Sequence, residues 1–322
     1  MIGPEEYPAN VNPLTGLVVD DPAVLARRPL EIKISNAPPV VRPQSGLSHA
    51  DLIFEHYAEG GWTRFAAIFY SQGADHVGSV RSARLLDLEL PQMYDAILVF
   101  SGGSEGVITM IRRAPFYPSR TLSPQFGWGE PYFVRFPREG LEWEHTLFSD
   151  TADLWAWADL MGVNRAPRLS TPGLAFIETP PPGGMPALEA TIEYARTIAV
   201  WEYSPLLGRY LRWSDGVPHV DALTSEQLGF ANVIILSAYH EEIDILPEEL
   251  GPGQRSLEIA LWGEGPITLL RDGLRYEGLW QRASPTDQLT FTDLDGNALP
   301  LKPGPSFIQV IRRGFEPVTI LP

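Results

Sequence analysis

Glycine and proline together make up nearly a fifth of this chain, and they limit how long any regular element can be. The 322 residues include 29 glycines and 31 prolines, which are not arranged in repeats. Proline lacks a backbone N–H donor and glycine favours turns, so such frequent interruption favours short strands over long helices. We therefore expect a β-rich protein, long enough for two domains that each bury a core.

The first half of the sequence alternates strand-like and helix-like segments. Leu30, Ile32 and Ile34 alternate with charged residues in 28–36, which is typical of a strand. This alternation of elements predicts a sheet with packed helices. The other expected elements are strands at 50–61 and 63–71, a short helix at 83–95 that stops near Pro91, a strand and then a helix at 95–113, and a helix at 149–163 with Ser149 or Asp150 as N-cap and an apolar face of Leu154, Trp157, Ala158 and Met161.

The second half has a different pattern. Residues 177–190 contain three prolines followed by two glycines, which is typical of a linker. Short apolar runs follow, with Asp-Gly turns at 271–273 and 293–297, and these predict antiparallel hairpins. The expected fold class is α+β, an N-terminal sheet with packed helices followed by a β-rich, mainly antiparallel C-terminal domain. The expected division is an extended segment at 1–28, an α/β-type domain at 29–176, the linker at 177–190 and an antiparallel β domain at 191–322.

Charge and composition exclude several classes of function. The chain has 40 acidic and 24 basic residues, a formal net charge of -16, and this balance argues against a nucleic-acid partner or attraction to an anionic membrane surface. It has no cysteine, which excludes disulfides and thiolate chemistry within this sequence. No apolar run reaches the length of a membrane span.

Three arginines lie close together in an otherwise apolar stretch. Arg64 opens a predicted strand, and Arg81 and Arg84 flank Ser82 where a strand is expected to lead into a helix. Guanidinium and hydroxyl groups at such a position can hold a phosphate or a carboxylate through bidentate hydrogen bonds. The alternative is internal ion pairing with one of four nearby carboxylates, those of Glu55, Glu59, Asp87 and Glu89.

A glycine-rich turn at Ser101, Gly102 and Gly103 ends one predicted strand and precedes a helix. Phosphate-binding loops occur at such positions, because ligands bind at the carboxyl ends of strands in open α/β sheets. The turn lacks the Lys of a Walker motif and the glycine spacing of a dinucleotide fingerprint, so a simple tight turn is the alternative.

Glu55 and Glu59 share one face of the strand predicted at 50–61. Two carboxylates near arginines could hold a divalent cation beside a phosphate, and the alternative is that they are solvated or paired with arginine. No other cofactor is expected. The histidines show no HExxH spacing and no serine lies in a G-x-S-x-G motif, so the motifs offer no support for hydrolytic catalysis.

Several sequence blocks, above all RPQSGLSHAD and VGSVRSAR, resemble those of the YerB family over nearly the whole chain. Members of that family resemble exported bacterial lipoproteins, so the resemblance implies a precursor with a leader and a lipidated cysteine outside this sequence. Where the family has Pro-His-Asn, this chain retains His145 but carries Thr146 in place of the amide. The resemblance therefore adds His145 to the candidate site.

A second, local similarity covers residues 60–90. The pattern TRFAAIFYS…VGSVRSAR is similar to that of the LytR-CpsA-Psr phosphotransferases, in which two arginines contact a polyprenyl pyrophosphate. Arg64 and Arg81 match those arginines, whereas Ser82 replaces the Asp that follows the second one. This similarity implies anion binding more than metal-assisted transfer.

These observations lead to one functional hypothesis and two alternatives. We expect an extracytoplasmic protein, tethered to the membrane only through a lipid anchor, that binds an anionic and phosphorylated small molecule or lipid head group of the cell envelope. The first alternative is a metal-assisted phosphotransferase or hydrolase, and the second is a non-catalytic module with a protein partner and structural arginines. The expected ligand-binding residues are Arg42, Arg64, Arg81, Arg84, Ser82, Glu55, Glu59, Ser101, Gly102, Gly103 and His145.

Overall fold

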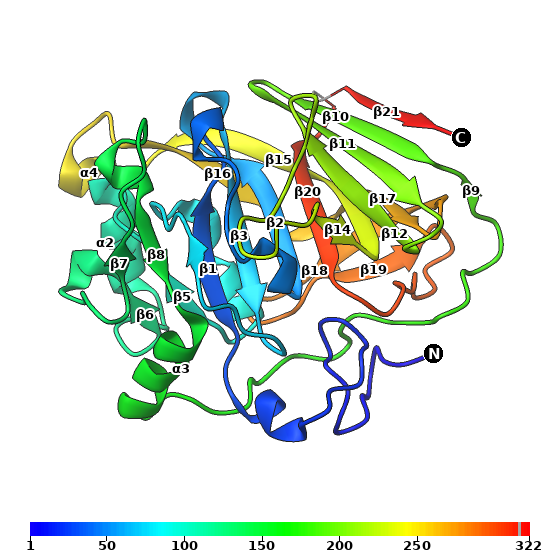
Figure 1. Cartoon of the computed structure of the whole chain (residues 1–322), viewed down its shortest axis with the longest axis horizontal. Helices are drawn as coiled ribbons and strands as arrows, with labels where there is room; N and C mark the ends of the chain where they lie inside the picture. The colour runs from blue at the N-terminus through cyan, green and yellow to red at the C-terminus, as the bar shows by residue number, and fades with distance from the viewer. Residues whose placement is uncertain (315–316) are drawn as a thin grey trace.

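A mixed sheet of twelve strands forms the centre of the molecule (Figure 1). The computed structural model describes residues 1–314 and 317–322. The strands of this sheet are β1 (Leu30–Ser35), β2 (Leu52–Tyr57), β3 (Thr63–Phe69), β5 (Ile97–Val99), β6 (Thr121–Leu122), β9 (Met185–Pro186), β15 (Asn232–Asp244), β16 (Arg255–Ala260), β17 (Gly263–Arg271), β18 (Leu274–Arg282), β19 (Thr290–Asp293) and β20 (Ser306–Arg312). Their order is β19-β18-β17-β15-β20-β2-β3-β1-β5-β6, with β16 beside β15 and β9 beside β18.

Two smaller sheets and several short helices surround this sheet. The six-stranded sheet contains β10 (Glu189–Tyr194), β11 (Thr197–Ser204), β12 (Arg209–Ser214), β13 (Val217–Pro218), β14 (Gly229–Phe230) and β21 (Val318–Leu321), and the three-stranded sheet contains β4 (Val77–Gly78), β7 (Val134–Arg135) and β8 (Leu147–Ser149). The helices are α1 (Leu90–Met93), α2 (Glu105–Arg113), α3 (Thr151–Leu160) and α4 (Pro247–Leu250), with 3-10 turns η1 (Pro22–Ala26), η2 (Pro39–Val41), η3 (Leu47–His49), η4 (Glu59–Gly61), η5 (Leu85–Leu88), η6 (Pro124–Phe126) and η7 (Trp143–His145).

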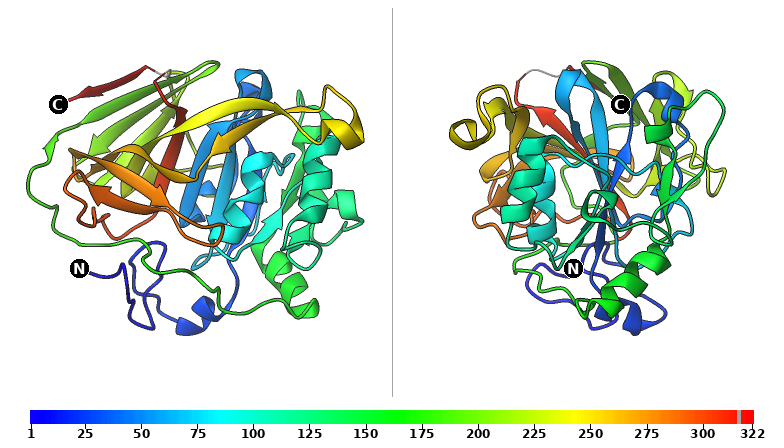
Figure 2. Two further views of the ribbon diagram at one scale, coloured as in Figure 1. Left: turned by 180° about the vertical axis from the view of Figure 1, so that it is seen from behind. Right: turned by 90° about the vertical axis from the view of Figure 1, so that its left-hand side faces the viewer.

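The α+β fold class expected from the sequence is confirmed, since the molecule is mostly sheet with few helices. In Figure 1 the helices α2 and α3 gather at one end, while the six-stranded antiparallel sheet lies at the other. Figure 2 shows β15 and β16 extending as a long arm toward the helical end. Ile245, just beyond β15, packs there with α2 residues such as Ile108 in one buried cluster.

The two halves of the chain share the central sheet. Strand β20, near the C-terminus, lies between β15 and β2 and is parallel to both. The second half is otherwise mainly antiparallel, with the predicted hairpin at Asp272–Gly273 joining β17 to β18. Residues 185–186 of the expected linker form β9, which pairs with β18. The position of the domain boundary at 177–190 stays a prediction.

One predicted helix end agrees with the structure, and two other details of the predicted helices do not. Asp150 caps α3 by accepting a hydrogen bond from the Ala152 amide, as predicted. Met161 was expected on the buried face but is 43% exposed, because α3 ends at Leu160. Pro91 was expected to stop a helix, yet it lies in the first turn of α1, where a missing N–H leaves no hydrogen bond unmade.

A buried ion pair connects the two halves across the sheets. Glu55 on β2 and Arg212 on β12 are both fully buried, with Oε2 and Nη2 separated by 2.5 Å. Glu55 also accepts hydrogen bonds from Asn36, Thr63 and Gln309. A desolvated charge pair is tolerated when both charges are satisfied in this way, so removing one partner leaves an expensive buried charge.

We predict that Arg212→Met destabilises the protein by about 3–5 kcal/mol, because Glu55 loses its buried counter-charge. Urea unfolding measures this loss. The double variant Arg212→Met/Glu55→Gln should be more stable than the sum of the two single effects implies. The matched control is Arg255→Met, which removes an exposed pair with Glu242 and should cost less than about 1 kcal/mol. An Arg212→Met effect no larger than that of the control would contradict the assignment.

Candidate site: an arginine-lined cavity

A cavity of about 320 Å³ opens between β3, the chain after β4, the turn η2 and the turn η7. Arg64 and Arg81 contribute its two basic side chains, and His145 its imidazole. Ala37, Pro38, Val40 and Trp62 contribute apolar groups to the lining. The complete lining consists of Ala37, Pro38, Val40, Trp62, Arg64, Arg81, Gly140, Glu142, Glu144 and His145.

Arg64 is the most buried arginine of the cavity. It lies in β3 opposite Ser35 of β1 and His56 of β2, and only 8% of it is exposed. Its Nη1 donates to the Thr63 carbonyl, whereas its Nε is buried without a hydrogen-bond partner. Among the residues that the structure describes, no carboxylate forms an ion pair with it. Burial first, and then the charges of Arg84 and Arg81, lower the pKa of Arg64 to about 10.

Arg81 enters the cavity because its backbone is held on both sides. Its amide donates to the Lys33 carbonyl of β1 at 2.8 Å, and its carbonyl accepts from the Ser101 amide at 2.9 Å. Its Nη2 lies 3.3 Å from a Glu144 carboxylate oxygen, and its Nη1 donates to the Glu144 carbonyl. Burial lowers the pKa of Arg81 although Glu144 opposes the shift, and its Nε is buried without a partner.

Arg84 lies next to the cavity and is paired internally. It is the N-cap of η5, where its amide donates to Asp87 Oδ2 at 2.5 Å. Its Nε lies 2.5 Å from Glu59 Oε2, and Ser256 donates a further hydrogen bond to Glu59. The Arg84 Nη1 donates to the backbone carbonyls of Ser82 and Ala83. Arg84 therefore forms the internal ion pair with Glu59 that the sequence analysis gave as the alternative to anion binding.

Arg42 and Glu55 are not in the cavity lining. Arg42 forms an ion pair with Asp215 of the β12–β13 turn and donates to Asn36. Glu55 is buried against Arg212. The structure therefore brings together Arg64, Arg81 and His145, with Arg84 and Glu59 beside them, and places Arg42 and Glu55 elsewhere.

The glycine-rich turn contacts residues 81–83, which lead from Arg81 of the cavity toward η5. The Gly102 carbonyl accepts from the Ala83 amide at 3.0 Å, and Gly102 has a φ of 78°, which favours glycine. An added Cβ at Gly102 would stand 3.8 Å from Ser82 Oγ, so the turn runs close to Ser82. Ser101 and Gly102 thus position the 81–83 segment, and Gly103 leads to Ser104, the N-cap of α2. None of these turn residues lines the cavity.

His145 does lie in the cavity, as the family resemblance implied. It is 4% exposed and its Nδ1 is buried without a hydrogen-bond partner. Burial lowers the pKa of His145, and the positive charges of Arg81 and Arg64 lower it further. The motif reasoning missed Glu142 and Glu144, although their spacing in EWEH, directly before His145, could have indicated them.

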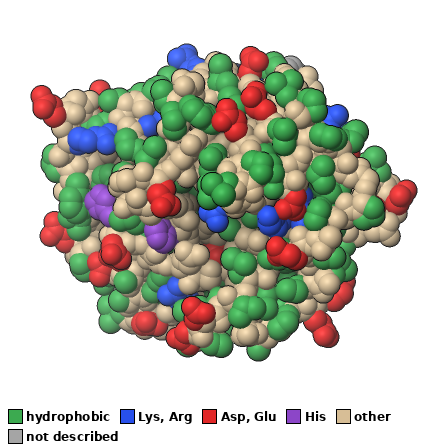
Figure 3. Space-filling view, turned by 45° about the vertical axis from the view of Figure 1, so that its right-hand side comes forward, with side chains coloured by type: hydrophobic (Ala, Val, Ile, Leu, Met, Phe, Trp, Pro, Cys, Tyr) green, Lys and Arg blue, Asp and Glu red, His purple; other side chains and the backbone are tan. Residues whose placement is uncertain are grey.

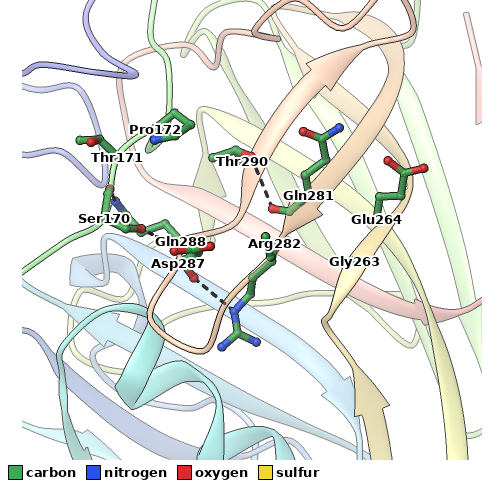
Figure 4. A pocket seen from close by; sticks show the side chains of 11 residues that line it. Ser170, Thr171, Pro172, Gly263, Glu264, Gln281, Arg282, Asp287, Gln288 and Thr290 are labelled. Carbon is green, nitrogen blue, oxygen red and sulfur yellow. Dashed lines mark hydrogen bonds between the residues drawn. The ribbon is translucent and has the colours of Figure 1, made fainter.

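A second cavity, of about 520 Å³, lies where β17 begins and β18 ends, beside residues 170–172. Figure 4 shows Arg282 there, pointing toward the turn at Asp287 and donating to its carbonyl. Arg282 also donates to Leu261 and Pro285 carbonyls and pairs with Glu89 at 2.7 Å. Four of its five N–H groups already donate hydrogen bonds, so this cavity suits a charged ligand less well than the one at Arg64.

The surface shown in Figure 3 carries interspersed acidic and basic side chains, and the basic ones occur singly or in small groups. Within the described residues, no helix has the length and apolar character needed to cross a bilayer.

Comparisons with known proteins cover most of the chain. The family model described as "Protein of unknown function (DUF3048) N-terminal domain" matches residues 14–164, and the model of the corresponding C-terminal domain matches residues 190–308. The chain is 28% identical over 305 residues to "Putative lipoprotein YerB" of Bacillus subtilis (strain 168), covering 93% of this chain and 85% of that protein. A crystal structure of YerB from Bacillus subtilis superposes with a TM-score of 0.78 and 26% identity, covering 96% of this chain and 99% of that one.

We predict that Arg81→Gln raises the pKa of His145, because it removes a nearby positive charge that disfavours the imidazolium and leaves Glu144 free to favour it. NMR titration of the ring over roughly pH 4 to 8 measures the shift. His76 is the internal control, since burial and Asp150 govern its pKa. A His145 titration that is the same in both proteins would contradict the contact with Arg81.

Proposed function

The chain belongs to the DUF3048 family of proteins of unknown function, and from this premise we propose that it is an extracytoplasmic, lipoprotein-type protein that binds an anionic, phosphorylated ligand of the cell envelope. The ligand binds in the cavity lined by Arg64 and Arg81. The lipoprotein part of the proposal rests on the name of the Bacillus subtilis relative.

The binding proposal rests on Arg64, which is buried and forms no ion pair with a carboxylate among the described residues. A buried charge without a counter-charge costs free energy, and so do two guanidinium groups that share one cavity. Arg64 is 8% exposed with an unpartnered Nε, and Arg81 has an unpartnered Nε as well. A phosphate between them would supply the missing negative charge and accept the unused hydrogen bonds.

The shape of the cavity favours a small anionic group attached to an organic body. A volume of about 320 Å³ is close to the lower end of the range for small-molecule sites. Two arginines and the apolar residues Trp62, Pro38 and Val40 all line it, and Val40 is 50% exposed. A phosphate ester or a lipid head group offers a negative charge for the arginines and an apolar part for these other residues.

The predicted carboxylates support binding more than metal-assisted transfer. Glu55 is committed to Arg212, and Glu59 is held by Arg84 and Ser256. Neither is a free ligand for a cation beside the phosphate. The alternative of a phosphotransferase or hydrolase that uses these two carboxylates therefore has less support than ligand binding.

We predict that Arg64→Gln and Arg81→Gln each weaken pyrophosphate binding on the order of ten- to a hundredfold, because each removes a hydrogen bond to a charged group worth about 1.5–3 kcal/mol. Calorimetric titration in the presence of a chelator measures the affinity without divalent cations. Pyrophosphate should also raise the melting temperature of the wild type.

The matched control is Arg113→Gln, which removes an equal charge from an exposed pair with Glu249. It should bind pyrophosphate as the wild type does. Vesicles with an anionic phospholipid form a second arm, which distinguishes a lipid head group from a free phosphate compound. Wild-type protein that neither binds pyrophosphate nor binds such vesicles through Arg64 and Arg81 would contradict the proposal.

A further inference from the structure

Three potential metal ligands lie together on the wall of the arginine-lined cavity. Glu142, Glu144 and His145 each offer one ligand atom, and these atoms all lie within 4.8 Å of one another. Glu142 is the N-cap of η7, and the other two residues belong to that turn. The short turn therefore presents two carboxylates and one imidazole at a single place.

A second observation points to a ligand at this place. His145 is 4% exposed, and its Nδ1 is buried without a hydrogen-bond partner in the described structure. A buried ring nitrogen normally has a partner, because leaving it unsatisfied costs free energy. A cation coordinated by Nδ1 itself would remove that cost.

The ligand set indicates the class of cation. Mg²⁺ and Ca²⁺ prefer sites made wholly of oxygen ligands, whereas imidazole together with carboxylates suits first-row transition metals. We propose that Glu142, Glu144 and His145 bind a divalent transition-metal cation such as Mn²⁺ or Zn²⁺ at the rim of the cavity. Three protein ligands leave coordination positions open for water or for an oxygen of the anion.

The proposed site is coupled to anion binding through Glu144, and this step rests on the proposed function. Glu144 lies 3.3 Å from Arg81 and partly neutralises it. A cation that takes the Glu144 carboxylate releases the Arg81 guanidinium, which then faces the cavity with its full charge. Cation and anion therefore strengthen each other's binding, as linkage requires.

The first test uses Mn²⁺ alone, followed by the loss of its free-ion EPR signal on titration with protein. Wild-type protein should bind Mn²⁺, and Glu142→Gln, Glu144→Gln and His145→Gln should each bind it at least about tenfold more weakly. Glu139→Gln is the matched control, since Glu139 is an exposed carboxylate of the preceding loop outside the cluster. Metal-free melting curves show whether each variant is folded, and the exposed Glu142 provides the variant least disturbing to packing.

The second test measures phenyl phosphate affinity with and without saturating Mn²⁺. Mn²⁺ should strengthen binding to the wild type and have no effect on His145→Gln. Glu144→Gln should bind phenyl phosphate more tightly than the wild type in the absence of metal, because Arg81 is already released. Glu139→Gln should behave as the wild type.

Absence of Mn²⁺ and Zn²⁺ binding, equal Mn²⁺ binding by all variants, or tighter binding of Mg²⁺ than of Mn²⁺ would overturn the metal site. Pyrophosphate binding in the presence of chelator does not depend on that result, so the two proposals fail separately. Mn²⁺ binding that leaves phenyl phosphate affinity unchanged would overturn the coupling through Glu144.

Discussion

The ion pair between Glu55 and Arg212 is the contact on which the arrangement of the two halves depends. Both side chains are fully buried, and Glu55 accepts hydrogen bonds from residues of both halves, including Thr63 and Gln309. Because an unpaired charge at this depth is costly, another packing of the six-stranded sheet against β2 would be disfavoured. Asp221 adds a second link by accepting hydrogen bonds from the Gly46 and Ser48 amides. Gly46 and Ser48 of the block RPQSGLSHAD thus contact the second half of the chain through Asp221.

A buried polar layer then connects the sheet to the candidate site. The Lys33 ammonium donates to Asp87 at 2.7 Å, and Asp87 in turn holds the amide of Arg84. The Lys33 carbonyl receives the amide of Arg81. Burial and the adjacent Asp87 raise the pKa of Glu31 well above its usual range. One lysine thus positions both ends of the 81–84 segment. Arg64 beside this segment forms no ion pair with a carboxylate among the described residues.

Three of the residues expected in the candidate site line the cavity, but others assigned to the same site lie elsewhere. Arg64 and Arg81 were predicted from residue type and position, and His145 from the family resemblance, and all three line the cavity. Arg42 was assigned to the same site but pairs with Asp215, about 170 residues away in the chain. No local pattern could show that pairing, because it depends on how β12 packs beside the η2 turn. Glu142 and Glu144 were missed, although the EWEH spacing could have indicated them, because exposed glutamates are common and only the packing of η7 brings them to the cavity.

The sequence by itself determined the β-rich character and the position of the main strands, and it limited the N-cap of α3 to Ser149 or Asp150. Alternation, turn residues and capping act over a few neighbouring positions. The sequence also limited the charged candidates to a small set of arginines and carboxylates. Only the tertiary structure decided which of them are neutralised. Arg84 forms an ion pair with Glu59, and Arg212 forms one with Glu55. Arg64 forms no ion pair with a carboxylate within the described residues. The availability of a charge depends on burial and on partners distant in the chain, and these exist only once the sheets have packed.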